Sequence, residues 1–347
     1  MTDLARLASS RDLLNVVVIG PRRGESVLVG SRDRGWLVID SLRGDQHNDQ
    51  ELPHPVLAAL WQLGGEVALL ALTHPHDDHA VGFSDLVAHC TAPVGCVPQL
   101  VPHRRGTSST RLHLAASVDD ALAAIREAWE DESTDRIWRL APGPDADRML
   151  GDVLVEVLSP SREEVEAVLA TENPDLNAIS TAMRVTWQEL EFVLGADLTT
   201  DGWHGVDSRR GGTGAAAAMH KGSHHGSSTA HHPWALGSAP PVDRAVAITP
   251  YSVKVPNFDL GRDVDLLHQT IGSLRMTAVR GVAATAPLTM TTADVRSHRA
   301  GTFAGLLAVL ENPPHLAWDA WWAWSFDETG VVVDMRHGPS AKVVTPG

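Results

Sequence analysis

The sequence predicts an α/β fold built on mixed β-sheets, and three observations lead to this prediction. Apolar, β-branched runs at residues 14–19, 26–29 and 35–40 are separated by glycine and proline and indicate a β-meander. Apolar residues at helical spacing over residues 53–63 end at two glycines, which predicts a helix and its stop. A continuous apolar run at residues 67–72 then predicts a buried strand.

The same alternation continues along the chain and favours a single domain of packed α and β layers. Further helices are expected at residues 81–89, 117–132 and 263–274, and further strands at residues 153–158, 179–185, 190–194 and 245–248. A Gly/Ala tract at residues 211–218 predicts a flexible loop. We assign residues 1–347 to one domain with a tryptophan-rich C-terminal extension from about residue 315, whose tryptophans favour core or interface packing over a binding platform.

Composition and charge narrow the class of protein. The formal net charge of −15 disfavours a basic surface that grips long nucleic acid, although bound metal dications would add the positive charge that a nucleotide substrate needs. No apolar run reaches the roughly 20 residues of a membrane-spanning helix, so we expect a cytoplasmic protein without membrane contact. The two cysteines, Cys90 and Cys96, are too few for a disulfide framework and are expected to be idle thiols.

Histidine is unevenly distributed, with 18 residues concentrated around positions 74–79 and 220–232. The first cluster lies where the strand at residues 67–72 ends. His74 and His76 are alternate residues, so an extended backbone can point both rings at one metal ion. Asp78 and His79 can then turn toward a second ion, and such mixed nitrogen and oxygen ligands suit Zn²⁺ or Mn²⁺.

Residues 73–79 resemble the H-x-H-x-D-H signature of the metallo-β-lactamase fold, with every ligand position filled. Asp40 resembles the aspartate of that family that ends an early strand and supports a metal ligand, and Asp197 resembles its metal-bridging aspartate. These similarities span roughly residues 14–250 in the expected order. They imply a four-layer αββα sandwich with mixed sheets and a metal-dependent hydrolase with two divalent ions.

Three further motifs point to a branch of that family. Residues 221–227 resemble the late K-x-x-H-H-G-S motif of the competence-type DNA-uptake nuclease domain and of phosphorylcholine esterases. Residues 20–26 resemble the early G-x-G-E-S turn of bacterial members associated with defence against mobile elements, although Arg22 and Arg23 replace a small residue. Residues 159–161 and 177–180 resemble the S-P-S and N-x-x-S elements of that branch. This resemblance implies phosphodiester cleavage.

The resemblance also implies roles for single residues. His74 and His76 would hold one metal, Asp78 and His79 the other, and Asp197 would lie between them.

For the second histidine cluster, we expect His225 to be the last ligand of the second metal. His224 is then free to contact a phosphate or protonate a leaving group, and the two roles could be exchanged. Lys221 could neutralise an anionic substrate, although a solvated loop lysine is the favoured interpretation. His204, His231 and His232 are expected mainly at the surface.

One position departs from the wider family. Most members supply a further histidine just before the strand that leads to the bridging aspartate, and Asn177 stands there in this chain. His89, His103 and His113 lie on other predicted elements. The first metal would then have fewer protein ligands, which leaves a position for water or a substrate oxygen. Alternatively, Asn177 is only a turn residue that caps a strand.

The motif set defines a chemistry and leaves the substrate open. Two ions roughly 3.5–4 Å apart would share a hydroxide and stabilise an in-line displacement. We expect hydrolysis of a phosphodiester, in nucleic acid or a small nucleotide. The alternative reaction is hydrolysis of a small carboxylic ester, thioester or lactam. A hypothesis of another class is a partner-binding module of a bacterial defence system, motivated by the tryptophan-rich last third. A metal-free relic is disfavoured because the other ligand positions are filled.

Overall fold

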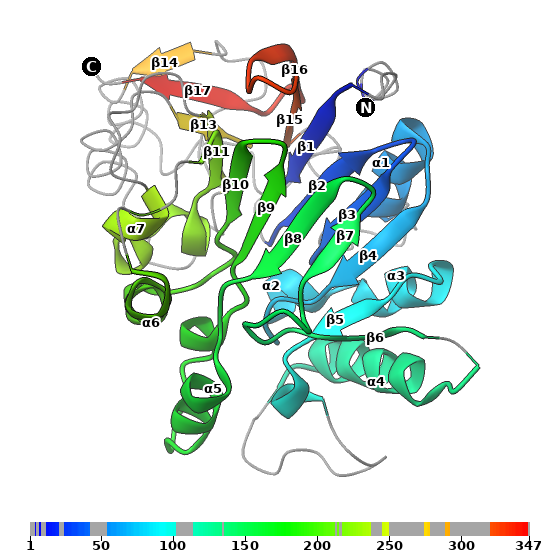
Figure 1. Ribbon diagram of the computed structural model, residues 1–347, viewed down its shortest axis with the longest axis vertical. Helices are drawn as coiled ribbons and strands as arrows, with labels where there is room; N and C mark the ends of the chain where they lie inside the picture. Colours follow the sequence, from blue (N-terminus) through cyan, green and yellow to red (C-terminus); the bar gives the residue numbers. More distant parts are fainter. Residues whose placement is uncertain are drawn as a thin grey trace, which may run out of the picture.

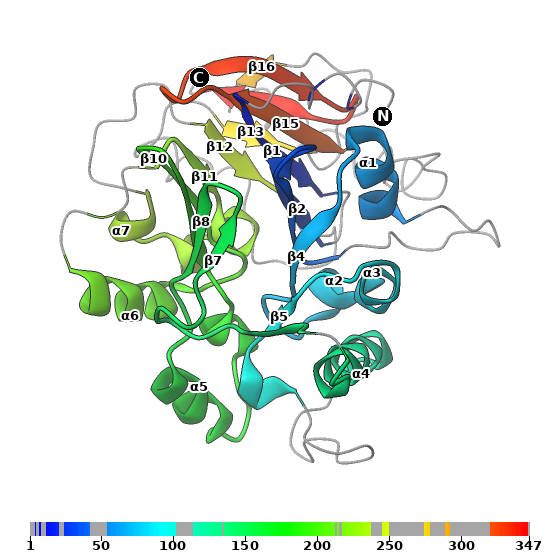
Figure 2. The ribbon, with the colours of Figure 1, turned by 45° about the vertical axis from the view of Figure 1, so that its right-hand side comes forward.

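Two mixed β-sheets face each other at the centre of the molecule, and helices cover their outer faces (Figures 1 and 2). The four layers are clearest in Figure 2, where α1–α4 lie outside one sheet and α5–α7 outside the other. The computed structural model describes residues 4, 7, 12–20, 24–41, 54–101, 114–133, 135–211, 214, 217–236, 245–249, 274–277, 289–291 and 320–345.

The first sheet, sheet A, has eight strands in the order β16-β15-β1-β2-β3-β4-β5-β6. Pairing is antiparallel from β16 to β3 and parallel from β3 to β6, so the sheet is mixed. Its strands are β1 (Leu14–Ile19), β2 (Ser26–Ser31), β3 (Gly35–Ile39), β4 (Val67–Ala71), β5 (Val94–Cys96), β6 (Ile137–Arg139), β15 (Trp321–Phe326) and β16 (Val332–His337). The β-meander and the buried strand that follows it are confirmed.

The second sheet, sheet B, has nine strands in the order β14-β17-β13-β12-β11-β10-β9-β8-β7. Strands β10 to β13 run parallel to one another, while β7 to β10 are antiparallel neighbours. Its strands are β7 (Arg148–Leu150), β8 (Val153–Val157), β9 (Met183–Trp187), β10 (Leu190–Leu194), β11 (Met219–Lys221), β12 (Ala245–Ile248), β13 (Leu274–Met276), β14 (Thr289–Thr291) and β17 (Lys342–Thr345). The mixed α/β class expected from the sequence is therefore confirmed.

The helices of the described residues are short, and none is long and apolar enough to cross a membrane. They are α1 (Pro55–Leu63), α2 (Asp77–Ala80), α3 (Phe83–His89), α4 (Ala116–Glu130), α5 (Arg162–Leu169), α6 (Thr200–Arg210) and α7 (Pro233–Leu236), with 3₁₀ turns η2 (Pro98–Leu100), η3 (Leu176–Ile179), η4 (Ser223–Gly226) and η5 (Ser228–Ala230).

Local chemistry sets where these helices begin and end. Helix α1 starts at a proline, its cap His54 accepts a hydrogen bond from the backbone of Val56, and it ends at Gly64 with φ 70°. Helix α3 begins later than predicted because Gly82 precedes it in a left-handed conformation.

The strand expected at residues 179–185 also begins later, at Met183, because residues 176–179 form η3 with Asp175 as its cap. The helix expected at residues 263–274 lies outside the described residues, apart from its last residue, which is in β13. Half of the loop expected at residues 211–218 also lies outside them.

The tryptophans near the C-terminus lie in the core. Trp321, Trp322 and Trp324 of β15 are at most 2 % exposed, and β15 pairs with β1 in sheet A. The Nε1–H of Trp322 also donates to the carbonyl of Met276 in sheet B, over 2.8 Å. The packing interpretation is confirmed for these three residues; Trp318 lies outside the described residues. The partner-binding hypothesis stays a prediction.

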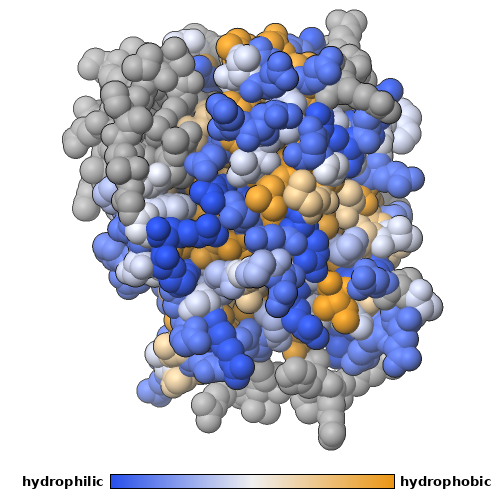
Figure 3. Space-filling model, viewed as in Figure 1, coloured by the Kyte–Doolittle hydropathy of each residue, from blue (hydrophilic) through white to orange (hydrophobic). Residues whose placement is uncertain are grey.

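The surface is mainly hydrophilic on the face that Figure 3 shows, with apolar side chains in separate patches. Few large apolar side chains are strongly exposed in the described chain, and Trp61 is the most exposed of them at 85 %. Both cysteines are free, and burial raises the pKa of Cys96 to about 12, so this thiol is inert as expected.

The buried β15 tryptophans generate a stability prediction. Replacing Trp322 by alanine should lower the free energy of unfolding by about 3–5 kcal/mol, because it leaves a large cavity between the sheets. Trp61→Ala is the matched control and should change it by less than about 0.5 kcal/mol. Urea unfolding of the metal-free protein measures both. Equal effects of the two substitutions would contradict the placement of β15 in the core.

Candidate metal centre

The site lies where the carboxyl ends of parallel strands from both sheets meet. Asp40 follows β3, residues 74–79 follow β4, Asp197 follows β10 and His225 follows β11. Strands β3 and β4 are parallel neighbours in sheet A, and β10 and β11 are parallel neighbours in sheet B. Residues far apart in the sequence are therefore brought to one edge of the sandwich.

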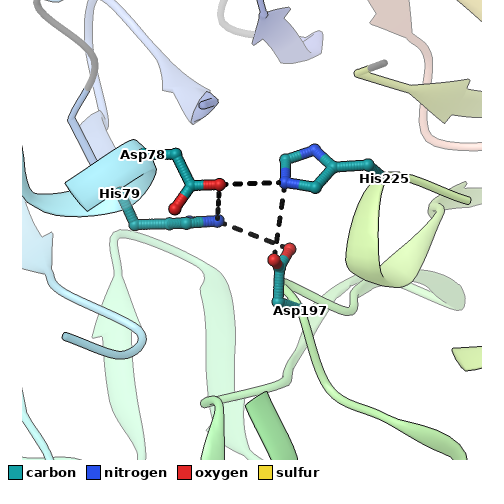
Figure 4. A group of neighbouring side chains, drawn as sticks. All are labelled: Asp78, His79, Asp197 and His225. Carbon is teal, nitrogen blue, oxygen red and sulfur yellow. Dashed lines mark hydrogen bonds and ion pairs between the residues drawn. The ribbon is translucent and has the colours of Figure 1, made fainter. Parts of the chain in front are cut away.

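Four buried side chains converge at this edge, and we call them the tetrad: Asp78, His79, Asp197 and His225 (Figure 4). His225 Nε2 lies 3.3 Å from Asp78 Oδ2 and 3.4 Å from Asp197 Oδ2. His79 Nε2 lies 3.4 Å from Asp197 Oδ1 and 4.0 Å from Asp78 Oδ2. One donor atom from each residue lies within 4.8 Å of all the others.

The tetrad fits a divalent metal ion. His79 Nε2 and Asp197 Oδ1 are buried and have no hydrogen-bond partner among the described residues. Buried polar atoms without a hydrogen-bond partner are costly, and a cation bound between these two, which lie 3.4 Å apart, would satisfy both. Two imidazole nitrogens and two carboxylate oxygens form a donor set that suits Zn²⁺ or Mn²⁺.

Asp40 orients His79 from behind. Its Oδ2 accepts a hydrogen bond from His79 Nδ1 over 2.7 Å, which leaves His79 Nε2 for the tetrad. Thr73 donates to the same carboxylate from its backbone N–H (2.7 Å) and from Oγ1 (2.8 Å). The geometry is that of an aspartate supporting a metal ligand.

His74 and His76 lie beside the tetrad as a separate pair. Their rings approach to 3.0 Å between His74 Nε2 and His76 Nδ1. His74 Nε2 is 4.0 Å from Asp197 Oδ2, and His74 Nδ1 contacts Thr73 Oγ1 and Ser180 Oγ at 3.0 and 3.1 Å. Asp197 is therefore the tetrad residue that adjoins this pair, through His74.

Asn177 faces His224, with 3.4 Å between Asn177 Nδ2 and His224 Nε2. Asn177 lies inside η3, so it does not cap a strand. His224 Nδ1 also contacts Thr229 Oγ1 at 3.1 Å. Between the two consecutive histidines, the structure brings His225 to the tetrad and places His224 beside Asn177.

Backbone conformations that are rare for residues with a Cβ gather here. Of the five described non-glycine residues with positive φ, four are Asp40, Ala196, His224 and His225. Gly195 precedes Ala196, and a Cβ on it would lie only 1.9 Å from Ser223 Oγ, so the two ligand-bearing loops approach as closely as glycine allows. Such strain concentrates at functional sites, where the surrounding structure enforces it.

Charge is balanced within the tetrad. Burial acts to lower the pKa of His225, but the charge of Asp197 and hydrogen bonds to Asp197 and Asp78 outweigh it and raise the pKa to about 10. Burial also disfavours charge on His79, and the carboxylates of Asp197, Asp40 and Asp78 raise its pKa well above the ordinary value. Both rings therefore hold protons near neutral pH when no metal is bound.

The His74 and His76 pair has the opposite character. Burial is the main cause that lowers the pKa of both rings, and neighbouring histidines lower it further. Burial likewise lowers the pKa of His224. These three rings therefore favour the neutral form near pH 7.

Lys221 corrects one expectation. It is not a solvated loop residue: it lies in β11, is 1 % exposed and forms an ion pair with Glu25. It is therefore shielded from any substrate in this structure. Strand β11 is central in sheet B, which is why the residue is buried.

Of the three histidines expected mainly at the surface, His204 is exposed and His231 is half-buried, but His232 is buried, which corrects the expectation for that residue. His204 and His232 contact each other at 2.9 Å, His231 Nε2 contacts the carbonyl of Gly226, and His89 Nδ1 contacts the carbonyl of Asp85 at the end of α3. His103 and His113 are outside the described residues.

Sequence analysis missed the roles of several supporting residues. Ser180 and Glu25 fall within the motifs at residues 177–180 and 20–26, so the sequence marked both residues. It did not reveal which residues they contact. Ser180 Oγ accepts from the backbone N–H of Asp197 over 3.2 Å. Thr249 accepts from His225 Nδ1 over 2.7 Å and stands in no motif that could have revealed it.

Comparison with protein families gives one match: residues 19–161 match the Metallo-beta-lactamase superfamily. This segment contains Asp40 and the run from His74 to His79. The resemblance to the superfamily is confirmed at this level, and the narrower branch stays a prediction. No curated protein matches the chain.

Several solved structures are similar. The metallo-beta-lactamase fold protein YhfI from Bacillus subtilis is 14 % identical with a TM-score of 0.39, and the match covers 75 % of this chain and 93 % of that one. The metallo-beta-lactamase SMB-1 is 16 % identical (TM-score 0.37; 63 % and 82 % covered). Zn²⁺-bound PqqB from Methylobacterium extorquens is 12 % identical (TM-score 0.34; 59 % and 71 % covered). Likenesses at these TM-scores support no conclusion about this chain.

Metal uptake should release protons. The raised pKa values of His79 and His225 mean that an incoming ion must displace about two protons near neutral pH. Affinity should therefore increase as the pH rises toward 10. Calorimetric titration with Zn²⁺ in two buffers of different ionisation enthalpy measures the release. Identical heats in both buffers would show that the rings are already neutral.

The two consecutive histidines should differ in their effect on metal content. His225→Asn should weaken Zn²⁺ binding more than the roughly 10–100-fold that loss of a supporting partner costs, because it removes a ligand. His224→Asn is the matched control and should retain the ion, since asparagine also tolerates the left-handed backbone of both positions. Elemental analysis after dialysis measures the content. If only His224→Asn loses the ion, then His224 is the metal ligand and His225 is not.

Proposed function

We propose that this protein is a metal-dependent hydrolase that cleaves phosphodiesters. The observation that carries the proposal is the tetrad, which gathers two imidazoles and two carboxylates from both sheets at one buried point. Each histidine presents one ring nitrogen to that point while the other is held from behind, by Asp40 for His79 and by Thr249 for His225. This arrangement is typical of metal sites.

The two halves of the site are unequal in this proposal. The tetrad holds the resident ion, because its four donor groups already converge. His74 and His76 form a second position, in which Asp197 Oδ2 lies 4.0 Å from His74 Nε2 and Asn177 replaces the expected histidine. That position leaves room for oxygen ligands from the substrate or water.

A bound divalent ion would polarise the phosphoryl oxygen and lower the pKa of a water molecule at the site. The chain's own part is to fix the ligands and orient the substrate. Asp78 and Asp197 supply the negative charge that holds the ions. His224, half-buried and neutral beside Asn177, can hydrogen-bond a phosphate oxygen through a ring nitrogen.

The choice of phosphodiesters is supported by the resemblance of residues 221–227 to the K-x-x-H-H-G-S motif. The net charge of −15 favours a small or metal-bridged substrate over a long duplex. Hydrolysis of a small ester, thioester or lactam uses the same kind of centre and is the alternative that the experiment below separates.

Purified protein loaded with Mn²⁺ or Zn²⁺ should hydrolyse bis(p-nitrophenyl) phosphate, measured by release of p-nitrophenol. Asp78→Ala removes a tetrad carboxylate and should reduce the rate at least about 100-fold. Activity that survives this substitution would identify a contaminant.

The same preparations should be tested on a thioester, a lactone and a β-lactam. Turnover of one of these with no phosphodiester cleavage would overturn the substrate assignment and leave the metal centre intact. No turnover of any of them by metal-loaded protein would overturn the assignment as a hydrolase of these classes.

A further inference from the structure

Glu25 and Lys221 form a buried ion pair directly behind the tetrad. Glu25 lies in the turn before β2 of sheet A, and Lys221 ends β11 of sheet B. Their exposed fractions are 2 % and 1 %. The backbone N–H of Glu25 also donates to the carbonyl of the tetrad residue Asp78 over 3.2 Å. The pair thus joins the two sheets at the site.

Thr249 connects this pair to a tetrad histidine. Its Oγ1 donates to Glu25 Oε2, the same oxygen that pairs with Lys221. Its carbonyl accepts from His225 Nδ1 over 2.7 Å, and its Oγ1 lies 3.2 Å from the same nitrogen. Glu25 Oε2 is itself 3.6 Å from His225 Nδ1. All the residues in this chain of contacts are buried.

Gly20 leaves the space for this arrangement. A Cβ on Gly20 would lie 2.4 Å from Thr249 Cγ2, and its carbonyl accepts from Thr277 Oγ1 over 2.7 Å. Gly20 therefore packs directly on the segment after β12, and Glu25 is hydrogen-bonded to the same segment through Thr249. These contacts account for both the glycine and the glutamate of the motif at residues 20–26.

We propose that Glu25, Lys221 and Thr249 are positioning residues that fix the ring of His225 for metal binding. Glu25 holds Thr249 in place, and Thr249 fixes the Nδ1 side of the ring so that Nε2 faces Asp78 and Asp197. Lys221 neutralises the charge of Glu25, because an unpaired buried carboxylate is strongly unfavourable. This inference rests on the proposed metal centre and changes the role of Lys221 from substrate contact to support.

The experiment compares Zn²⁺ affinity, by chelator competition, with the absorption spectrum of the Co²⁺-loaded protein. Thr249→Val removes the link to Glu25 without leaving a buried charge. It should lower Zn²⁺ affinity about 10–100-fold and change the Co²⁺ spectrum, as loss of an outer partner does. Thr249→Ser keeps the hydroxyl and should behave as wild type. Glu25→Gln should weaken binding at least as much as Thr249→Val.

Glu156→Gln is the matched control, because Glu156 forms a similar ion pair with Arg184 in sheet B at 2.7 Å. It should destabilise the metal-free protein and leave affinity and spectrum unchanged. If Glu156→Gln weakens Zn²⁺ binding as much as Glu25→Gln does, the effect of Glu25→Gln is only a loss of stability, and the inference is overturned. If Glu25→Gln fails to fold, Thr249→Val decides alone, and wild-type affinity in that variant overturns the inference. Wild-type protein that binds no Zn²⁺ would instead overturn the proposed function.

Discussion

The structure depends on placing two carboxylates, Asp78 and Asp197, in a buried position between two sheets. Such groups are expensive to remove from water unless opposite charge or a metal ion compensates them. His79 and His225 supply that compensation from either side, and each is held by a partner on its own sheet. The polar contacts around the tetrad serve this compensation of charge. They hold the loops that bring the tetrad residues to one point from the ends of different strands.

The cost of this convergence is visible in the backbone. Left-handed conformations at Asp40, Ala196, His224 and His225 are tolerated because each residue follows within four positions of a strand end, at β3, β10 or β11, which fixes the start of its loop. His225 cannot turn away without losing the carbonyl of Thr249. The ligands are therefore preorganised, and binding an ion requires the loss of protons more than the movement of chain.

Local signals in the sequence predicted most of the first half of the fold. The meander at residues 14–40, helix α1, strand β4 and the ligand run after it follow from hydrophobic periodicity and turn residues, which act over short distances. What could not be predicted depends on contacts between distant segments. From the sequence, Lys221 resembles a loop lysine next to glycine, but it lies in the central strand β11, and Glu25, which is distant in the sequence, pairs with it there. Likewise, the contact between Asn177 in η3 and His224 joins segments 47 residues apart, which no local pattern reveals.

Strands β15 and β17 complete sheets A and B respectively, although the ligand run lies within the first 80 residues. The ribosome therefore makes Asp40 and His74 to His79 long before the strands that pair with β1 and β13 exist. Contacts of such high sequence separation form late and slow folding. A nascent chain stopped before β15 carries several ligands on an unfinished sandwich with exposed sheet edges, which makes it a substrate for chaperones and proteases. The ligands can therefore be held in their final positions only after β15 and β17 have been synthesised and have paired with their sheets.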